Sequence, residues 1–251
     1  MTDAPMLVTQ GLDKSFGSLV VASDISLSLP QGARYALIGP NGAGKTTLIN
    51  LITGMLTPDA GRIVLGGEDV TEIGPADRVK RGLVRTFQIN TLFPNLTPLE
   101  AVMLAVCERR GEAGTWWRSL PSYGAAAEEA YGILQTLRLA EFCDRPTRQL
   151  AYGQQRLLEI ALGLAAQPKV LLLDEPAAGV PKSESGELFE AVAGISSEIS
   201  ILFIEHDMDV VFRFASRIIV MVAGRILVEG TPAEIATHPQ VREVYLGAHH
   251  G

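Results

Sequence analysis

The chain has no long apolar segment, although 47% of its 251 residues are hydrophobic. A membrane-spanning helix needs about 20 consecutive apolar residues, and no uninterrupted run approaches that length. The sequence therefore does not predict a membrane-spanning protein. The apolar runs at residues 170–173, 201–204 and 218–222 have the length of strands instead, which is typical of a parallel sheet covered on both faces.

Signals for secretion and for disulfide bonding are also missing. Residues 1–6 contain neither a basic n-region nor an apolar h-region, so we expect the protein to stay in the cytosol. The chain has two cysteines, Cys107 and Cys143, and their separation is not that of metal ligands. Because disulfides are uncommon in the cytosol, we interpret both cysteines as packing residues.

Positive charge is not in excess, since 21 Lys and Arg residues stand against 28 Asp and Glu, for a net charge of −7. A nucleic-acid groove needs clustered Lys and Arg to displace phosphate counterions, so we predict no nucleic-acid partner. The sequence also lacks internal repeats, low-complexity tracts and flexible linkers. We therefore expect one domain over residues 1–251, built as a core with a lobe inserted into it.

Among the features that are present, the segment 39–46 is the most informative. Its sequence, Gly-Pro-Asn-Gly-Ala-Gly-Lys-Thr, fits the phosphate-binding pattern G-x-x-x-x-G-K-[ST], called the P-loop. It lies between a predicted buried strand at 35–38 and a predicted helix at 46–53 that ends at Gly54. In that order the glycines let backbone amides face the phosphates, the helix adds its positive end, and a threonine hydroxyl is placed for Mg²⁺. The motif predicts ATP binding by Gly39, Pro40, Asn41, Gly42, Ala43, Gly44, Lys45, Thr46 and Thr47, with Thr46 as the metal ligand.

Two carboxylates follow the buried run at 170–173, an arrangement called Walker B. We expect Asp174 to hold Mg²⁺ through water and Glu175 to polarise the attacking water as general base. Neighbouring side chains on a strand point to opposite faces, so we expect a bend at Pro176 to let the two acids take separate tasks.

A histidine, His206, follows the buried run at 201–204. A lone histidine at a sheet edge is more often a structural hydrogen-bonding residue. Together with a P-loop and a Walker B pair, however, we interpret His206 as a contact to the γ-phosphate.

The remaining patterns predict three kinds of local structure. Alternating apolar and hydroxylated residues at 25–29 and a hairpin-like segment at 62–69 predict an antiparallel, half-exposed sheet. Residues 89–149 contain no strand-like run but carry helical patterns at 96–107 and 125–139, so we predict an inserted helical lobe. From residue 150 onward, helical and buried-strand patterns alternate, which is typical of βαβ units.

Residues 150–156, Leu-Ala-Tyr-Gly-Gln-Gln-Arg, resemble the signature motif of ATP-binding-cassette (ABC) ATPases, usually written L-S-G-G-Q. Further motifs then fall into the family's order over residues 7–247. The resemblance implies that Phe16 stacks on adenine and that Gln88, in the Q-loop, contacts Mg²⁺ and the γ-phosphate with a catalytic role. It also implies a D-loop at residues 178–181 and makes His206 the switch histidine.

The resemblance also implies a fold and an assembly. The fold is the α/β fold of P-loop NTPases: a RecA-like core with an N-terminal antiparallel β subdomain, at residues 1–88 and 151–251, and an inserted helical subdomain at 89–150. Two cassettes, forming a homodimer or a heterodimer with a paralogous cassette, are implied to close head to tail around two Mg-ATP. The signature residues that then contact the ATP of the opposite subunit are Ala151, Tyr152, Gly153 and Gln154.

A narrower resemblance links the chain to the ATP-binding subunits of importers for branched-chain and related amino acids. It rests on residues 85–88, 92–97, 150–156, 158–161, 174–179 and 243–247. Such a subunit acts in the cytoplasm, peripheral on the inner face of the cell membrane. Its partners are membrane permeases and, indirectly, a periplasmic or extracellular substrate-binding protein.

Two departures from the family pattern affect the chemistry. Ala151 replaces the signature serine and removes a hydroxyl that would bond the γ-phosphate held by the opposite subunit. We expect the backbone N–H of Gly153, the Gln154 side chain and the dipole of the following helix to serve instead. Pro181, in the D-loop, fixes φ and removes a backbone donor, which bears on communication across the dimer.

Other functions stay open on the sequence alone. Lipid or lipopolysaccharide exporters have cassettes of the same size and share part of the Walker B context. Soluble cassettes that act on DNA or ribosomes usually have two cassettes or a long basic or coiled insertion, which this chain lacks. A regulatory protein that binds ATP without hydrolysing it is a third alternative, suggested by Ala151 and the unusual D-loop.

Overall fold

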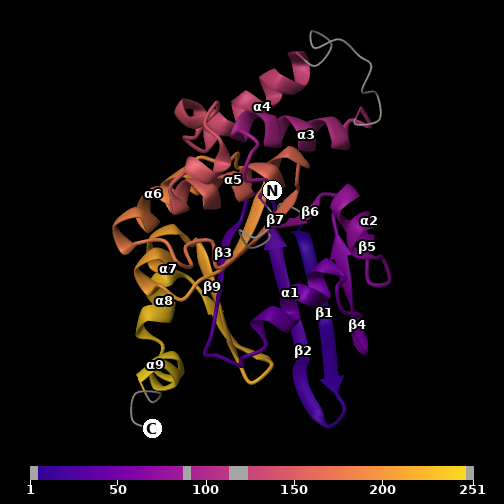
Figure 1. The fold of residues 1–251 in the computed structure, drawn as a ribbon. Helices are drawn as coiled ribbons and strands as arrows, with labels where there is room; N and C mark the ends of the chain where they lie inside the picture. The colour runs from indigo at the N-terminus through magenta and orange to yellow at the C-terminus, as the bar shows by residue number, and fades with distance from the viewer. Residues whose placement is uncertain (1–4, 87–91, 113–123, 247–251) are drawn as a thin grey trace.

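The computed structural model describes residues 5–86, 92–112 and 124–246 (Figure 1). Its first sheet is antiparallel, with the order β2-β1-β4-β5. In β2 the side chains of Ile25 and Leu27 are buried and Ser26 between them is exposed, which confirms the predicted half-exposed sheet. The strands are β1 (Pro5–Phe16), β2 (Leu19–Pro30), β4 (Ala60–Leu65) and β5 (Glu68–Asp69).

The second sheet is parallel except at one edge, where β10 pairs antiparallel with β9. In spatial order it contains β10 (Arg225–Gly230), β9 (Arg217–Val222), β3 (Arg34–Ile38), β8 (Ser200–Ile204), β7 (Val170–Asp174) and β6 (Leu83–Arg85). Successive side chains of β8 enter two different cores, with Ile201 and Phe203 on one face and Leu202 and Ile204 on the other. The apolar runs are continuous because both faces of this sheet are covered, as predicted.

The helices divide between the two faces. One core lies between the parallel sheet and most of the helices, and the other lies between this sheet, α1 and the antiparallel sheet (Figure 1). The helices are α1 (Lys45–Thr53), α2 (Pro75–Lys80), α3 (Pro98–Arg109), α4 (Gly124–Thr136), α5 (Tyr152–Ala165), α6 (Lys182–Ala193), α7 (Met208–Phe214), α8 (Pro232–Thr237) and α9 (Pro239–Leu246), with short 3₁₀ turns η3 (Ala140–Phe142) and η4 (Thr147–Gln149). The α/β fold class with a separate antiparallel sheet is therefore confirmed.

Helices α3 and α4 pack against each other and against α5, at the end of the molecule opposite the antiparallel hairpin (Figure 1). Thr97 starts α3 with a capping box, because its hydroxyl accepts from the Glu100 N–H and the Glu100 carboxylate accepts from the Thr97 N–H. The described part of residues 89–150 contains no strand. This agrees with a helical insertion, whose boundaries at 89 and 150 stay a prediction.

Helix α1, which follows the predicted P-loop, is held firmly at its far end. Gly54 follows it with a φ of 77°, a left-handed conformation that favours glycine. Arg78 is 1% exposed, and its guanidinium donates to the carbonyls of Leu51 (2.8 Å) and Ile52 (2.5 Å). A cation at this position also complements the negative end of the helix.

Two further expectations concern membrane-spanning helices and the cysteines. No helix in the described ranges is long and apolar enough to cross a membrane. Cys107 is buried in the core and Cys143 is half-buried, both as free thiols, which agrees with packing roles.

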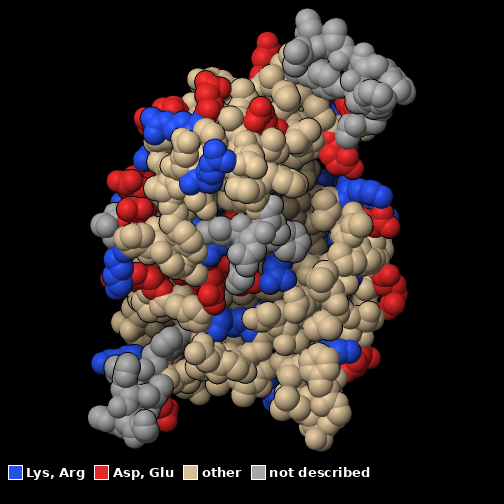
Figure 2. All heavy atoms as spheres, in the orientation of Figure 1, with Lys and Arg blue, Asp and Glu red and all other residues tan. Residues whose placement is uncertain are grey.

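On the face drawn in Figure 2, acidic and basic side chains of the described residues are interspersed, and neither sign forms a continuous patch.

Candidate nucleotide site

A pocket of about 570 Å³ lies at the carboxyl ends of four parallel strands, β3, β7, β8 and β9. Residues 41–47 of the P-loop line it, together with Glu175 after β7 and His206 after β8. Residues 19–21 of the β1–β2 hairpin and the turn at 223–224 complete the wall. The structure thus brings together the P-loop, one Walker B acid and the histidine, which are far apart in the sequence.

The glycines of the loop permit close contact with neighbouring backbone. A Cβ on Gly39 would lie 2.2 Å from the carbonyl oxygen of Met221, and a Cβ on Gly44 would lie 2.6 Å from that of Val21. Gly44 also has a φ of 99°, where side chains are disfavoured. Any larger residue at either position would push the loop away from the strands that support it.

Phosphate donors are in place at the start of α1. Gly44 is the N-cap residue, and no side chain of the described residues caps the first amides of the helix, so these N–H groups are open to an anion. Lys45 Nζ donates to the carbonyls of Gly39 (2.7 Å) and Pro40 (3.1 Å) in the loop. Burial lowers the pKa of Lys45, while the charges of Glu175 and Asp174 oppose that shift. The donor set fits a triphosphate.

The first Walker B acid, Asp174, is bound by an arginine. Arg85 Nη2 donates to Asp174 Oδ2 at 2.5 Å, and Arg85 Nη1 donates to Asn50 Oδ1 at 2.8 Å. The guanidinium therefore connects the ends of β6 and β7 to helix α1. Both side chains of the ion pair are mostly buried, which strengthens the interaction over that of a surface pair.

The second acid, Glu175, meets the histidine directly. His206 Nε2 and Glu175 Oε1 are 2.8 Å apart, and both side chains are about half-exposed toward the pocket. The chain bends here as predicted, because Pro176 lies in a turn closed by the Ala178 N–H, which donates to the Glu175 carbonyl at 3.0 Å. Glu175 itself has a φ of 49°. Its N–H still donates to the Ile204 carbonyl at 3.1 Å, which holds the strained residue next to β8.

A buried carboxylate, Glu205, holds the backbone on both sides of this pair. Its Oε1 accepts from the Ala177 N–H (2.9 Å), and its Oε2 accepts from the His206 N–H (3.2 Å). Glu205 is 5% exposed, and burial raises its pKa even though both hydrogen bonds oppose that shift. One side chain thus connects the segment after Walker B to the segment that carries the histidine.

The four signature residues, all described, do not line this pocket. Ala151 is the N-cap residue of α5, and its N–H donates to Gln154 Oε1 at 2.9 Å. Because an alanine side chain cannot accept a hydrogen bond, only this half of a capping box exists. Among the described residues no side chain caps the first N–H groups of α5, so these groups and the Gln154 amide nitrogen can donate to an anion.

Two predicted residues need separate mention. Phe16, at the end of β1, is 52% exposed beside Lys14, whose Nζ lies 5.9 Å from the ring centroid. Phe16 is not among the described residues that line the pocket. Gln88 lies outside the described residues.

The residues present fit Mg²⁺ as a partner of phosphate. No group of three His, Cys, Asp or Glu within the described ranges could hold a metal alone. Mg²⁺, however, is usually bound by one or two protein ligands together with phosphates and waters. Thr46, at the start of α1, and Asp174 are residues of that kind.

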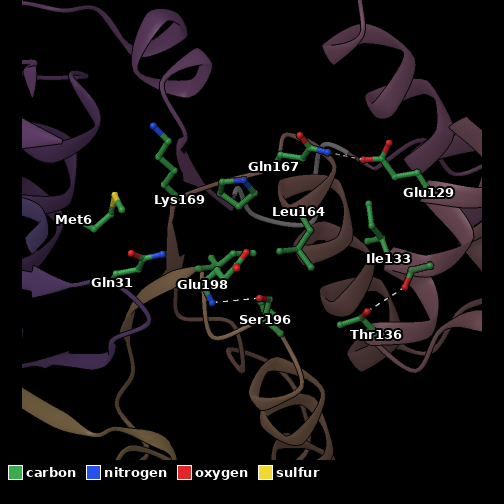
Figure 3. A pocket seen from close by; sticks show the side chains of 14 residues that line it. Met6, Gln31, Glu129, Ile133, Thr136, Leu164, Gln167, Lys169, Ser196 and Glu198 are labelled. Carbon is green, nitrogen blue, oxygen red and sulfur yellow. Dashed lines mark hydrogen bonds between the residues drawn. The ribbon is translucent and has the colours of Figure 1, made fainter. Parts of the chain in front are cut away.

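A larger cavity of about 620 Å³ lies elsewhere, between α4, the end of α5 and the turn before β8 (Figure 3). The predicted site residues within the described ranges are absent from its walls. Gln167 crosses it to donate to Glu129 at 3.0 Å. The size of this cavity does not by itself indicate a function. The smaller pocket at the P-loop, in contrast, contains phosphate donors and a hydrogen-bonded pair of an acid and a histidine.

Sequence patterns did not predict the hairpin residues 19–21 or the turn 223–224 in the pocket wall. They also did not predict three supporting residues: Arg85 contacts Asp174, Asn50 contacts Arg85, and Glu205 contacts the backbone of His206. Arg85 lies in the segment that leads to Gln88, and Glu205 directly precedes His206. A charged residue next to a predicted motif was therefore the only signal in the sequence that could have indicated them.

Comparison with known proteins identifies the family. Residues 22–178 match the ABC transporter family, and residues 225–251 match the branched-chain amino acid ATP-binding cassette transporter family. The chain is 37% identical to the high-affinity branched-chain amino acid transport ATP-binding protein BraF of Pseudomonas aeruginosa, over 97% of this chain and 98% of that protein. It is 38% identical to the corresponding protein LivG of Escherichia coli K12, with the same coverage of both chains.

Solved structures agree with this result. The crystal structure of an ATP-binding cassette of an ABC transporter in its ADP conformation superimposes with a TM-score of 0.85, at 33% identity, over 97% of this chain and 99% of that chain. A nucleotide-free cassette superimposes with a TM-score of 0.82, at 33% identity, over 96% and 98%. This likeness confirms the predicted P-loop NTPase fold. The chain belongs to the ABC transporter family and is one of its ATPase cassettes.

Proposed function

We propose that this cassette hydrolyses ATP to drive a membrane importer of branched-chain or related amino acids. The 2.8 Å contact between Glu175 and His206, facing the P-loop pocket, is the observation that supports hydrolysis most directly. The named relatives and the C-terminal family match support the substrate class. We place the protein in the cytoplasm, peripheral on the inner face of the membrane.

The nucleotide is bound by the P-loop. Lys45 and the open amides at the start of α1 bind the phosphates, and the apolar hairpin tip with Phe16 receives the base. Thr46, Asp174 and Gln88 would hold Mg²⁺, which would neutralise charge on the phosphates. Arg85 donates to Asp174 Oδ2 and so orients this carboxylate.

Hydrolysis depends on the acid and the histidine. Glu175 accepts the proton of the attacking water, and His206 orients the Glu175 carboxylate and contacts the γ-phosphate. Glu205 positions both, since it holds the backbone of Ala177 and of His206.

The active form is a dimer. The signature residues 151–154 do not line the pocket of their own subunit, so they serve the nucleotide of a second cassette, identical or paralogous. The N-terminus of α5 and the Gln154 amide supply the donors that Ala151 lacks.

A mostly apolar groove of about 270 Å³, between α5 and the segment after α1, is the proposed contact with the permease. Met55 and Val79 on its rim are 60% and 41% exposed. Glu159 in its wall is buried and accepts from Arg156 with Oε2, but its Oε1 has no partner among the described residues. A buried acceptor without a partner is costly. We therefore expect a permease segment with apolar side chains and one hydrogen-bond donor.

Transport in cells tests the function. Deleting the gene should reduce uptake of radiolabelled leucine, isoleucine and valine, and the wild-type chain should restore it, whereas Glu175→Gln should not. Unchanged uptake of all three, together with a defect in lipid or lipopolysaccharide export, would replace the import proposal with the export alternative. The transported molecule contacts the permease and binding protein, so the cassette itself does not distinguish among these amino acids.

A further inference from the structure

The signature segment of this chain touches its own D-loop through Tyr152, where the family pattern has glycine. A Cβ on Gly179 would lie 2.9 Å from Tyr152 Oη and 3.0 Å from Cε1. The tyrosine ring therefore rests on the Cα of Gly179, which itself has a φ of 79°. Glycine at 179 is needed both for this close approach and for the backbone conformation.

Arg156 makes the same connection with hydrogen bonds. Its Nη2 donates to Tyr152 Oη (3.2 Å) and to the carbonyl of Ala178 (3.2 Å), while Nη1 donates to Glu159 (3.0 Å). The guanidinium carbon lies 5.4 Å from the centroid of the Tyr152 ring. Arg156 is 7% exposed, so water competes little for these bonds. Helix α5 and the turn before α6 are thus joined by one buried cation and one aromatic ring.

The connection continues to the catalytic pair. The Ala178 N–H donates to the Glu175 carbonyl at 3.0 Å, and the Ala177 N–H donates to Glu205. Glu175 in turn contacts His206. A continuous series of contacts therefore runs from the first residue of α5 to the general base of the same subunit.

We propose that Tyr152 is a positioning residue that locks the signature segment to the D-loop of its own subunit. Nucleotide bound against the signature from the opposite cassette then orders Glu175 and His206 of this one. Ala151 lacks the hydroxyl, and Pro181 the backbone donor, that would help to connect the two nucleotide sites. We propose that the contact of the Tyr152 ring with Gly179 makes this connection within one subunit. This inference rests on the proposed dimeric ATPase.

Hydrogen exchange tests the lock in the free cassette. Tyr152→Gly should accelerate exchange of the Ala178 and Val180 amides at least tenfold, because both N–H groups are bonded inside the turn that the ring covers. Tyr152→Phe keeps the ring over Gly179 and should change exchange less than threefold. Tyr131→Ala removes a tyrosine of equal exposure on α4 and should leave these amides unchanged. Wild-type exchange in Tyr152→Gly would overturn the lock.

Cooperativity of turnover tests the communication. With two linked sites the Hill coefficient for ATP can approach 2, and Tyr152→Gly should bring it close to 1 while Tyr131→Ala keeps the wild-type value. If Tyr152→Gly exchanged faster but kept the wild-type Hill coefficient, the proposed communication between the two nucleotide sites would be wrong. The Tyr152 contact would then be purely structural. A wild-type cassette without ATP turnover would overturn the proposed function instead, and the exchange comparison would still decide whether the lock exists.

Discussion

Arg85 Nη2 lies 2.5 Å from Asp174 Oδ2, and the same guanidinium reaches Asn50 on the helix that follows the P-loop. The ends of β6 and β7 and the helix α1 are therefore connected by one side chain. The bond uses a single oxygen of Asp174, so this acid is oriented by the protein itself. Such preorganisation suits the proposed role of Asp174 in holding Mg²⁺ through water.

Replacing Arg85 should cost stability. We expect Arg85→Ala to lower the free energy of unfolding by about 1.5–3 kcal/mol, the usual value for hydrogen bonds to charged groups. Arg85→Lys should lose most of this as well, because an ammonium cannot bridge two acceptors in a fixed fork. Urea unfolding measures the change. Arg81→Ala, which removes an exposed ion pair with Glu68, is the matched control, and wild-type stability in Arg85→Lys would contradict the bridging role.

Glu175→Gln should retain ATP binding and lose most turnover. The amide keeps the shape of the side chain and its distance to His206, but it cannot accept a proton. A positioned base contributes 10²-fold or more, so turnover should fall at least that far and an ATP-bound dimer should accumulate. Phosphate release and size-exclusion chromatography measure the two effects. Turnover within a factor of about two of wild type would remove Glu175 from the role of base.

Lys45→Ala should weaken ATP binding itself. The backbone cradle stays, but the cation paired with the β- and γ-phosphates is lost. Calorimetry with Mg-ATP should show a clear loss of affinity in Lys45→Ala. Lys80→Ala removes a lysine whose side chain is 76% exposed and should bind as wild type does. Equal ATP affinity in the two variants would contradict the assignment of the P-loop lysine.

The buried Glu205 should make stability depend on pH. Its pKa in the folded chain is raised above the ordinary value of 4.5 by burial, so the folded state binds more protons than the unfolded state just above that pH. Stability from this group is therefore fully present below about pH 4.5 and declines as pH rises through the folded pKa. Glu205→Gln removes the titration while its amide oxygen still accepts from Ala177.

The measurement is urea unfolding of both proteins between pH 4 and 8. The stability of wild type should fall relative to that of Glu205→Gln as pH rises across this range. Carboxylates far from Glu205 titrate alike in both proteins and cancel in the difference, whereas Glu175 and His206 interact with Glu205 and contribute to the difference with it. A difference that is flat with pH, or that changes in the opposite direction, would show that Glu205 is ionised as readily in the folded chain as in the unfolded one.

Local patterns predicted most of the fold and, in the pocket, the P-loop residues, Glu175 and His206, but not the wall formed by residues 19–21 and 223–224. The runs at 170–173 and 201–204 are strands because both faces of the sheet are covered, and Gly54 ends α1 in the left-handed conformation that glycine favours. The contacts made by Arg85 and Arg156 could not be predicted this way, since their partners lie 89 and 22 positions away. Such pairs depend on tertiary packing, which periodicity does not record.

The turn after Walker B shows the same limit in a single residue. Pro176 lies in the turn that its sequence predicted, but no local pattern predicted the positive φ of 49° at the preceding Glu175. Hydrogen bonds from neighbouring strands and from Glu205 hold that conformation. Strain of this kind is maintained by surroundings that lie far away in the sequence.

Ala151→Ser should favour the closed ATP dimer. Ala151 has the φ and ψ of an N-cap residue, −61° and 157°, and serine is preferred there because its oxygen accepts from the first amides of the helix. The same hydroxyl still has a proton to donate to the γ-phosphate of the opposite subunit. Since the Tyr152 ring is already turned onto Gly179, it leaves the start of α5 open to that phosphate. We expect a gain of about 1 kcal/mol or more in dimer formation.

Two measurements separate the helix cap from the phosphate contact. Urea unfolding without nucleotide reports the cap, which should add about 1 kcal/mol to monomer stability. Chromatography of Glu175→Gln with ATP, with and without Ala151→Ser, reports the dimer. A more stable monomer with no shift toward dimer would mean that the hydroxyl only caps α5. If Gly153→Asp, which places a carboxylate where the opposite phosphates should lie, left the dimer equally unchanged, the signature would not engage ATP of a second subunit, and the dimeric mechanism would be wrong.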